Sequence, residues 1–381
     1  MTPEVAEDDP TESPGRPLGF LLTASELEGV APTADWSRWI SRDRAPDSSD
    51  GAGFRTSWRD DLEQLAQLGA NEIAITLEWA RLWPTPNTPD GEEVEFRRDL
   101  LARISELGMT PWACLIDGTL PGWFADDERG FTDDKTRNLL WPRHVDWVGE
   151  TFGDLVGGWV PIREPRQWAA WGHLVGATPP GNQRRRDMQK MVDAITTAEI
   201  EAERLLRGSA PIATYVTGRT VLGEFENVKA APHAGWLADH LSQHWLDSLA
   251  DGAARDSFDR IIVQLRPGIS VDGDGAWQPL SGRDLPDALL APLESVLASS
   301  GDRSVVAAGD LAGVDHDGSA QVEHSSAMID GSAEVGAAGW WQSSPIDGWH
   351  WQHGFATSPG LIERDRSVRA AASAFPQQTS R

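Results

Sequence analysis

Short apolar segments alternate along the chain with longer stretches in which apolar residues recur every three or four positions. The spacing of Leu62, Leu65 and Leu68 is an example of the helical period, whereas the short segments have the length and composition of buried strands. Strands alternating with amphipathic helices are typical of a parallel sheet joined by crossover helices. We therefore expect eight strands, at residues 19–23, 72–77, 110–116, 158–162, 212–216, 260–265, 305–308 and 337–341.

Eight such strands, each followed by a helix or loop, predict a single (β/α)8 TIM barrel of the α/β class. The most regular helical periods cover residues 58–68, 98–107, 188–206 and 234–249. No Gly/Ser-rich or Pro-rich stretch is long enough to separate two domains. We expect a disordered acidic tail over residues 1–16, the barrel over 17–376, and a polar tail over 377–381. In such barrels the chemistry lies on the loops that leave the carboxyl ends of the strands.

Charge and cysteine content narrow the class of protein. The chain has 33 Lys and Arg against 59 Asp and Glu, a formal net charge of −26, which argues against a nucleic-acid partner bound through a basic face. No run of eighteen apolar residues predicts a membrane span, and the first residues are acidic rather than basic as in a targeting peptide. The single cysteine, Cys114, excludes an internal disulfide and a cysteine-based metal cage. We expect a cytoplasmic protein with no membrane partner; its oligomeric state is open.

Six motifs fall in a recognisable order: TASELEG at 23–29, EWARLWP at 78–84, LP at 120–121, REP at 163–165, PPG at 179–181 and DGWHW at 347–351. Together they resemble glycoside hydrolase family 1, the β-glucosidase-like retaining glycosidases, from about residue 19 to 375. The resemblance implies a (β/α)8 barrel, hydrolysis of O-glycosidic bonds and no cofactor. It also implies that Glu164 corresponds to the family's general acid/base, which lies in an Asn-Glu-Pro motif after the fourth strand.

Retaining hydrolysis requires a second carboxylate facing the first across the sugar. The family carries it in a Thr-Glu-Asn-Gly motif on the seventh strand, and the matching segment here, VAAGDLA at 306–312, places Ala308 at the position of the nucleophile. Asp310, two residues further on, is the candidate surrogate. By this alignment we do not expect ordinary β-glucosidase activity.

Two positions that serve the nucleophile in the family have changed as well. The arginine of the second strand is matched by Ala74, and the Asn-Tyr pair after the sixth strand by Gln264 and Leu265. Without the carboxylate, a buried arginine would be an uncompensated charge and a buried tyrosine hydroxyl would lose its partner. Three changes at three separate strands argue against a misplaced gap.

The residues that hold the sugar in the family also differ. Its first-strand Gln is matched by Glu26, its His-Trp after the third strand by Asp117 and Gly118, its Asn before the acid/base by Arg163, and a sugar-binding Glu by His350, while Trp351 is kept. A pocket whose hydrogen-bonding groups are exchanged loses affinity for the original hydroxyls. The expected ligand-binding residues are Glu26, Asp117, Arg163, Gln264, His350 and Trp351.

The pairing of Arg163 is open at this point. An ion pair between Arg163 and Glu164 would make that carboxyl a poor proton donor. Neighbouring residues on a strand point to opposite faces, however, which argues against the pair.

Histidine spacing gives no strong metal signal. His240 and His244 have i, i+4 spacing but no HExxH glutamate between them, so a solvated helix face is the better interpretation. Asp315, His316 and Asp317 fit a polar turn better than a cation site. We expect no metal.

Tryptophan is abundant, with 19 residues. Aromatic rings stack on sugars and aromatic ligands, and the C-terminal cluster is the candidate pocket wall. This cluster comprises Trp340, Trp341, Trp349 and Trp351. Others lie inside strand or helix patterns and are expected in the core: Trp58, Trp79, Trp112, Trp147 and Trp159.

Three functions are consistent with these observations. The first, which we favour, is a non-hydrolytic barrel, a pseudo-glycosidase, that binds a glycoside or another small molecule or serves as a structural or regulatory partner. The second is an enzyme with rearranged chemistry, in which Glu164 works with Asp310, Asp117 or Glu26. The third is a retaining glycosidase whose nucleophile lies elsewhere. A carboxylate about 5–5.5 Å from Glu164 would favour the third, and one roughly 6.5–9.5 Å away the second.

Overall fold

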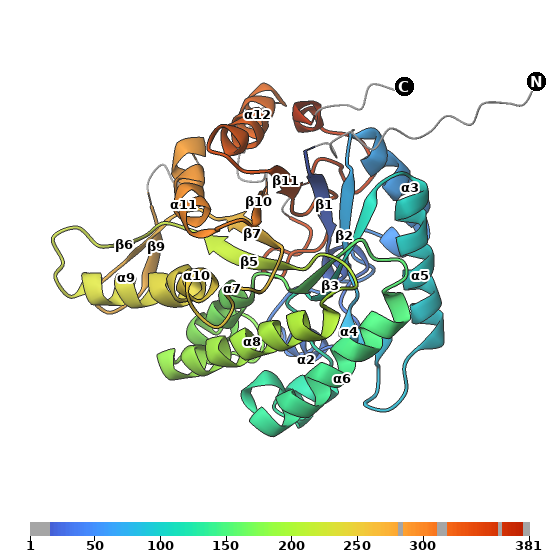
Figure 1. Ribbon diagram of the computed structural model, residues 1–381, viewed down its shortest axis with the longest axis horizontal. Coiled ribbons are helices and arrows are strands. Elements are labelled where there is room, and N and C mark those ends of the chain that lie inside the picture. The colour runs from blue at the N-terminus through green and yellow to red at the C-terminus, as the bar shows by residue number, and fades with distance from the viewer. Residues whose placement is uncertain (1–15, 281–284, 311–317, 357–359, 376–381) are drawn as a thin grey trace, which may run out of the picture.

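The computed structural model describes residues 16–280, 285–310, 318–356 and 360–375. Eight parallel strands form one sheet in the order β4-β3-β2-β1-β11-β10-β7-β5. A parallel bridge between Trp159 and Ile212 joins the two outer strands and nearly closes the sheet into a barrel (Figure 1). The strands are β1 (Leu18–Leu22), β2 (Glu72–Thr76), β3 (Thr110–Ile116), β4 (Gly158–Ile162), β5 (Ala213–Gly218), β7 (Arg260–Leu265), β10 (Ser304–Gly309) and β11 (Gly339–Gln342).

All eight expected strands are present and the (β/α)8 barrel is confirmed. The long helices surround the barrel (Figure 1). They are α3 (Phe54–Gln67), α5 (Gly91–Glu106), α6 (Asp134–Phe152), α8 (Arg185–Leu206), α9 (Ala230–Ala238), α10 (His244–Ala250), α11 (Pro286–Ser299) and α12 (Gly318–Glu334). Short helices lie on the loops: α1 (Ala24–Leu27), α2 (Asp35–Ile40), α4 (Trp79–Leu82), α7 (Pro165–Ala170), and the 3-10 or π segments Trp123–Asp127, Gly130–Thr132, Trp171–Val175, Asp239–Gln243 and Ala370–Ala374.

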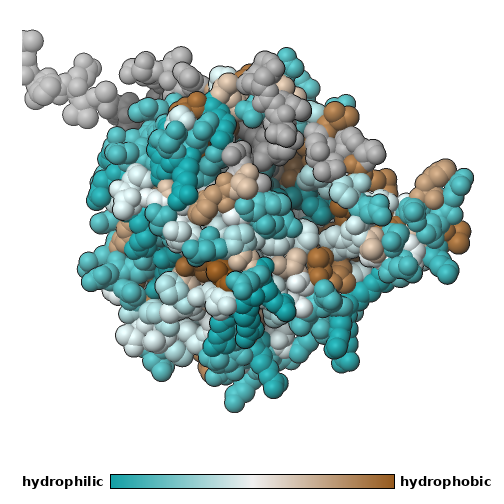
Figure 2. Space-filling view, turned by 180° about the vertical axis from the view of Figure 1, so that it is seen from behind, coloured by the Kyte–Doolittle hydropathy of each residue, from teal (hydrophilic) through white to brown (hydrophobic). Residues whose placement is uncertain are grey.

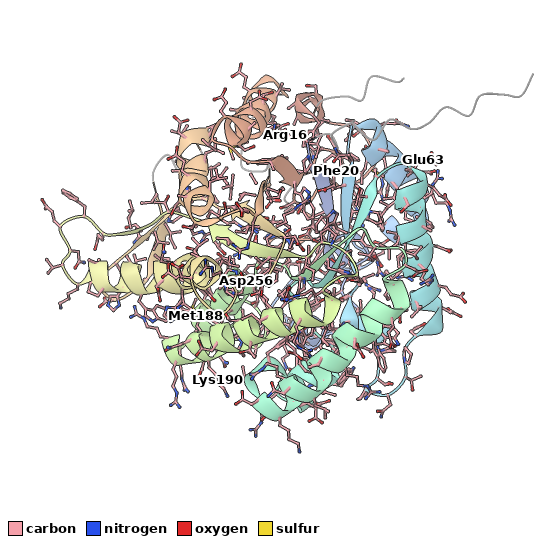
Figure 3. The ribbon with its side chains drawn as sticks, viewed as in Figure 1. Arg16, Phe20, Glu63, Met188, Lys190 and Asp256 are labelled. Atoms are coloured by element: carbon pink, nitrogen blue, oxygen red, sulfur yellow. The ribbon has the colours of Figure 1, made fainter. Side chains whose placement is uncertain are left out.

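Helices α5 and α8 illustrate two local signals, a capping side chain and an apolar face. The carboxylate of Asp90 accepts hydrogen bonds from the backbone N–H groups of Glu92 and Glu93, which fixes the start of α5. On α8, Met188 is buried against the core while Lys190 projects into solvent (Figure 3). Helix α8 therefore covers the barrel with one face only.

The single helix expected over residues 234–249 is wrong. Helix α9 ends at Ala238, a π turn covers Asp239–Gln243, and α10 begins at His244. A small second sheet, formed by β6 (Val221–Gly223), β8 (Ile269–Val271) and β9 (Trp277–Pro279), was not expected. Its strands are three residues long, too short for a periodic signal. The small sheet lies with α9 beside the barrel (Figure 1).

The barrel interior is filled by large side chains opposite glycines. Trp341 on β11 and Trp112 on β3 meet with ring centroids 5.4 Å apart. A Cβ atom at Gly19 would lie 2.4 Å from the Trp341 ring, and one at Gly158 would lie 2.4 Å from the Trp112 ring. Glycine at these two positions therefore admits the indoles, and the barrel is a packed core below its mouth.

The tryptophans predicted for the core are buried or half-buried, as expected. Trp340 and Trp341 are also buried, so only Trp349 and Trp351 of the C-terminal cluster reach the mouth of the barrel. The expectation that all four form a pocket wall is wrong, because alternate residues of β11 point into the barrel and toward the helices.

The rear of the molecule is largely hydrophilic (Figure 2). No helix in the described part of the chain is both long and apolar enough to span a membrane. The tails expected at residues 1–16 and 377–381 lie, except for Arg16, outside the described residues, as do Asp315, His316 and Asp317.

Candidate functional site

A cavity of about 620 Å³ opens at the carboxyl ends of the barrel strands. Its volume is within the usual range for small-molecule sites. Polar lining residues directly follow most of the strands: Thr23 and Glu26 after β1, Asp117 after β3, Arg163 and Glu164 after β4, Arg219 after β5, Arg266 after β7, and Asp310 after β10.

Most residues predicted for the site line this cavity: Glu26, Asp117, Arg163, Glu164, Asp310, His350 and Trp351. Gln264 and Ala308 do not, which corrects the expectation for Gln264. Ala308 is packed among the apolar side chains inside the barrel, and Gln264 is fully buried and accepts a hydrogen bond from the Ser343 hydroxyl at 2.9 Å. Both lie below the floor of the cavity because they are still within their strands.

The backbone after β4 turns two consecutive side chains into the cavity. The strand ends at Ile162, and Glu164 adopts a left-handed conformation (φ 42°, ψ 48°) immediately before α7. This conformation is unfavourable for a residue with a Cβ atom, and such strain concentrates at functional sites. Because of this turn, Arg163 and Glu164 both reach the cavity, although neighbours on a regular strand would diverge.

Arg163 does not pair with Glu164. Its guanidinium donates to the Asp117 carboxylate at 3.1 Å and to the Thr23 hydroxyl at 3.1 Å. The Thr23 hydroxyl in turn donates to Asp117 at 2.8 Å. Burial alone would lower the pKa of Arg163, but Asp117 and Glu164 outweigh it and raise that pKa well above its usual value. Arg163 is therefore a fixed cation on one side of the cavity.

Glu164 is held instead by Arg266, a residue that the sequence analysis did not single out. One terminal nitrogen of Arg266 lies 2.5 and 2.7 Å from the two carboxylate oxygens of Glu164, and Nε lies 3.1 Å from one of them. The other terminal nitrogen lies 3.3 Å from Asp310. Both oxygens of Glu164 thus accept hydrogen bonds from one guanidinium group.

Arg266 also separates the two carboxylates that could form a catalytic pair. On β10 the residue at the aligned nucleophile position is Ala308, and the next side chain on the same face belongs to Asp310. Asp310 and Glu164 are bonded to the same guanidinium rather than facing an open space between them.

Glu26, by contrast, forms no ion pair with any residue that the structure describes. It is half-buried, and its carboxylate accepts one hydrogen bond, from the Ser344 hydroxyl at 2.9 Å. Burial raises the pKa of Glu26 to about 7; Arg163 opposes this shift, whereas Asp117 and Asp310 add to it. Near neutral pH a substantial fraction of Glu26 is protonated and can donate as well as accept a hydrogen bond.

Aromatic rings form another part of the cavity wall. The Trp351 ring lies 5.6 Å from Trp171 and 6.3 Å from Trp36, and His350 stacks on Trp351. Burial, with a contribution from His353, lowers the pKa of His350 to about 4, so this imidazole is neutral at neutral pH. Trp36, Trp168 and Trp171 line the cavity but were not predicted, because they lie on loop helices without strand or helix periodicity.

No three His, Cys, Asp or Glu side chains in the described ranges come together in a way that could hold a metal ion. His240 stacks on Trp236 of α9 and lies within 2.9 Å of its carbonyl oxygen. Neither His240 nor His244 lines the cavity.

Comparison with known proteins identifies the fold family. Residues 42–222 match the family model described as "Glycosyl hydrolase family 1". The chain is 28% identical over 130 residues to "Beta-glucosidase 42" of Arabidopsis thaliana, covering 34% of this chain and 26% of that protein. It is 24% identical over 182 residues to "Probable inactive beta-glucosidase 25" of the same plant, covering 43% and 34%. Thus the alignments span about a quarter to a third of these two relatives.

The structural likeness extends over the whole barrel. The fold superimposes on a "beta-glycosidase from Pyrococcus horikoshii" with a TM-score of 0.82 at 20% sequence identity, covering 96% of this chain and 94% of that one. The matched segment and the relatives show that part of this chain is similar to glycosyl hydrolase family 1, and the solved structure shows that the whole barrel has the same fold.

Proposed function

We propose that this protein binds a small molecule of the glycoside class in the mouth of its barrel and does not hydrolyse it by the retaining two-carboxylate route. The observation that carries the proposal is the hydrogen-bonded ion pair between Glu164 and Arg266. In addition, Ala308 occupies the position on β10 where a nucleophile would be needed. The fold and the similarity to glycosyl hydrolase family 1 support the glycoside class of ligand.

The absence of retaining chemistry follows from what the two carboxyl groups must do. One must attack the anomeric carbon while the other donates a proton to the leaving oxygen. The methyl group of Ala308 cannot attack, and Asp310 is tied to the guanidinium that also occupies Glu164. A hydrolytic cycle would require both ion pairs to open in the same complex.

Binding is supported by the composition of the cavity. Trp351 and Trp171 offer aromatic faces, and Glu26, Asp117 and Arg163 offer hydrogen-bonding groups across from them. Small-molecule sites commonly combine an apolar wall with a few convergent polar groups. The "probable inactive" relative gives a precedent by name for a family member without activity.

The test of the proposal begins with hydrolysis. The purified protein and its Glu164→Gln variant are incubated with a panel of nitrophenyl glycosides and, separately, with a fluorinated glycoside that traps glycosyl-enzyme intermediates. We expect no turnover and no adduct by mass spectrometry. Turnover that disappears in Glu164→Gln, or a covalent adduct on any Asp or Glu, would refute the proposal.

Binding is measured on the same panel by calorimetry, with two variants. Trp351→Ala removes a ring of the cavity wall and should weaken binding, since loss of a stacked aromatic costs about 0.5–1.5 kcal/mol beyond its buried area. Phe225→Ala is the matched control, because Phe225 is 88% exposed and does not line the cavity. Equal affinities in wild type and both variants would place the ligand elsewhere.

A second candidate function rests on the raised pKa of Glu26. A carboxyl that titrates near pH 7 is suited to general acid/base work. In that case turnover of some member of the panel should survive Glu164→Gln, change as the pH crosses 7, and disappear in Glu26→Gln.

A further inference from the structure

Arg219 is a cation in the cavity without a counterion. It is the first residue after β5, it is half-buried, and its side chain lines the cavity. Among the described residues it makes no ion pair or hydrogen bond, and its Nε is shielded from solvent without a partner. Burying a charged donor without a partner is costly. The folded protein therefore keeps a guanidinium group that receives no hydrogen-bond acceptor from the described side chains.

The other two arginines of the cavity are already paired. Arg163 is bound to Asp117, and Arg266 to Glu164 and Asp310. Burial lowers the pKa of Arg219 to about 10; repulsion by Arg266 adds to this shift and attraction to Glu164 opposes it, so Arg219 is still charged at neutral pH. Arg219 is thus available to a ligand without breaking an existing ion pair.

The topology places Arg219 beside Arg266. Strands β5 and β7 are parallel neighbours in which Gly218 is paired with Leu265, so the next residue of each strand, Arg219 and Arg266, occupies equivalent positions. The backbone N–H of Arg266 donates to the Gly218 carbonyl at 2.8 Å and holds this register beyond the strand end. Both side chains line the same cavity.

We propose that Arg219, together with Arg266, binds an oxyanion carried by the ligand, a carboxylate or a phosphate group on a glycoside-class small molecule. The inference rests on the proposed function and specifies its ligand. A guanidinium presents a planar fork of donors that matches two oxygens of such a group. The aromatic wall formed by Trp171 and Trp351 remains available for the uncharged part of the molecule.

The paired residues indicate how the oxyanion is accommodated. Arg266 already serves two carboxylates, and its contact with Asp310, at 3.3 Å, is longer than those with Glu164 at 2.5 and 2.7 Å. A bound anion would therefore gain most of its new hydrogen bonds from Arg219 and share Arg266 in place of Asp310. The net charge of −26 opposes long-range attraction of anions, so recognition depends on these short contacts.

The experiment compares matched pairs of probes by calorimetry, in a buffer free of phosphate, sulfate and carboxylate. Methyl β-D-glucuronide is compared with methyl β-D-glucoside, and glucose 6-phosphate with glucose. We expect the anionic member of at least one pair to bind about 10-fold or more tightly than its neutral partner, as for a hydrogen bond between charged groups. The pair that shows the preference distinguishes a carboxylate from a phosphate ligand.

Variants assign that preference to Arg219. Arg219→Gln should reduce it to within about twofold, and Arg219→Lys should restore part of it, because lysine keeps the charge without the fork. Arg204→Gln is the control, since it removes one positive charge from an exposed position on α8 far from the cavity lining. Thermal melts establish that each variant is folded.

Each outcome supports or overturns the inference. Equal binding of neutral and anionic probes by the wild type, or a preference that persists in Arg219→Gln, overturns it while leaving glycoside binding intact. Hydrolysis of a probe refutes the proposed function and leaves the charge preference to be judged on its own. If no probe binds, both fail.

Discussion

Two glutamates, Glu26 on α1 and Glu28 at the C-cap of that helix, lie two residues apart and have different charged neighbours. Glu28 accepts hydrogen bonds from Arg97 at 2.5 and 2.9 Å and from Arg55 at 2.9 Å. Glu26 faces the cavity and accepts one bond from a serine hydroxyl. Burial raises the pKa of both carboxyls, but at Glu28 the arginines outweigh it and lower the pKa, whereas the pKa of Glu26 reaches about 7.

This difference between Glu26 and Glu28 distinguishes residues that stabilise the fold from residues that are available to a ligand. We call the group of Glu28, Glu93, Arg55 and Arg97 the structural network; Arg97 is 1% exposed and bonded to both glutamates. In the cavity, one carboxyl is partly protonated and one arginine is unpaired. Charges that are fully compensated within the fold are less available to a ligand than those that are under-compensated.

The largest effect is expected from breaking the structural network. Arg97→Met leaves two buried glutamates without their main partner and should destabilise the protein by about 3–5 kcal/mol. Urea unfolding measures the loss. Arg98→Met is the matched control on the same helix, because Arg98 pairs with Asp154 at the surface and should matter far less. Equal losses in both variants would mean that the network is not a special feature of the scaffold.

The next effect is a pH dependence that distinguishes Glu26 from Glu28. The pKa of Glu26 is raised in the folded state, so the native protein binds more protons between about pH 4.5 and 7 and loses stability as the pH rises through that window, by up to about 3 kcal/mol. Glu26→Gln should remove this loss, being more stable than wild type at pH 8 and similar at pH 4.5.

Glu28→Gln should behave in the opposite way. The folded-state pKa of Glu28 is lowered, so its contribution is present above its unfolded value and is lost on acidification. The measurement is the free energy of unfolding at pH 3, 4.5, 6 and 8, because the loss expected for Glu28 falls below pH 4.5. A Glu26→Gln variant whose stability runs parallel to that of wild type over this range would contradict the assignment.

A smaller effect is expected from replacing the unpaired cation. Arg219→Met removes a half-buried charge that makes no ion pair or hydrogen bond among the described residues, and should stabilise the protein by about 1 kcal/mol. Arg266→Met should do the reverse, because it leaves Glu164 and Asp310 without their shared partner. If both variants destabilise the protein equally, Arg219 has a partner in solution.

The smallest effect is expected at the surface. Arg204 is 62% exposed and pairs with Glu201 one turn away on α8. Arg204→Gln should leave the denaturation midpoint unchanged within error, because exposed ion pairs contribute little. A clear shift would show that simple loss of positive charge from this acidic protein affects stability, and the values for Arg97 and Arg219 would then need the same correction.

The barrel could be predicted from sequence because its strands are continuous apolar segments of distinctive length. The segments at 110–116, 158–162 and 260–265 coincide with β3, β4 and β7. The small sheet and the break between α9 and α10 could not, because three-residue strands and a π turn leave no periodic pattern.

The sequence predicts many residues of the site but not which charged residues pair with one another. Glu26, Asp117 and Asp310 were found by their place in a family resemblance, and the cavity includes them. Arg219 and Arg266 were missed, although a charged residue directly after a barrel strand is itself a signal. That Glu164 binds Arg266 rather than Arg163 depends on one left-handed residue, which no spacing rule provides.

The shared register of β5 and β7 has a consequence for variation among proteins of this architecture. Because Arg219 and Arg266 are placed by paired backbones, an insertion in the loops that follow would leave both guanidinium groups where they are. A single residue inserted within either strand would turn one of the two arginine side chains away from the cavity and toward the surrounding helices. Among relatives that carry both arginines, strand length therefore indicates whether the two side chains face the same cavity.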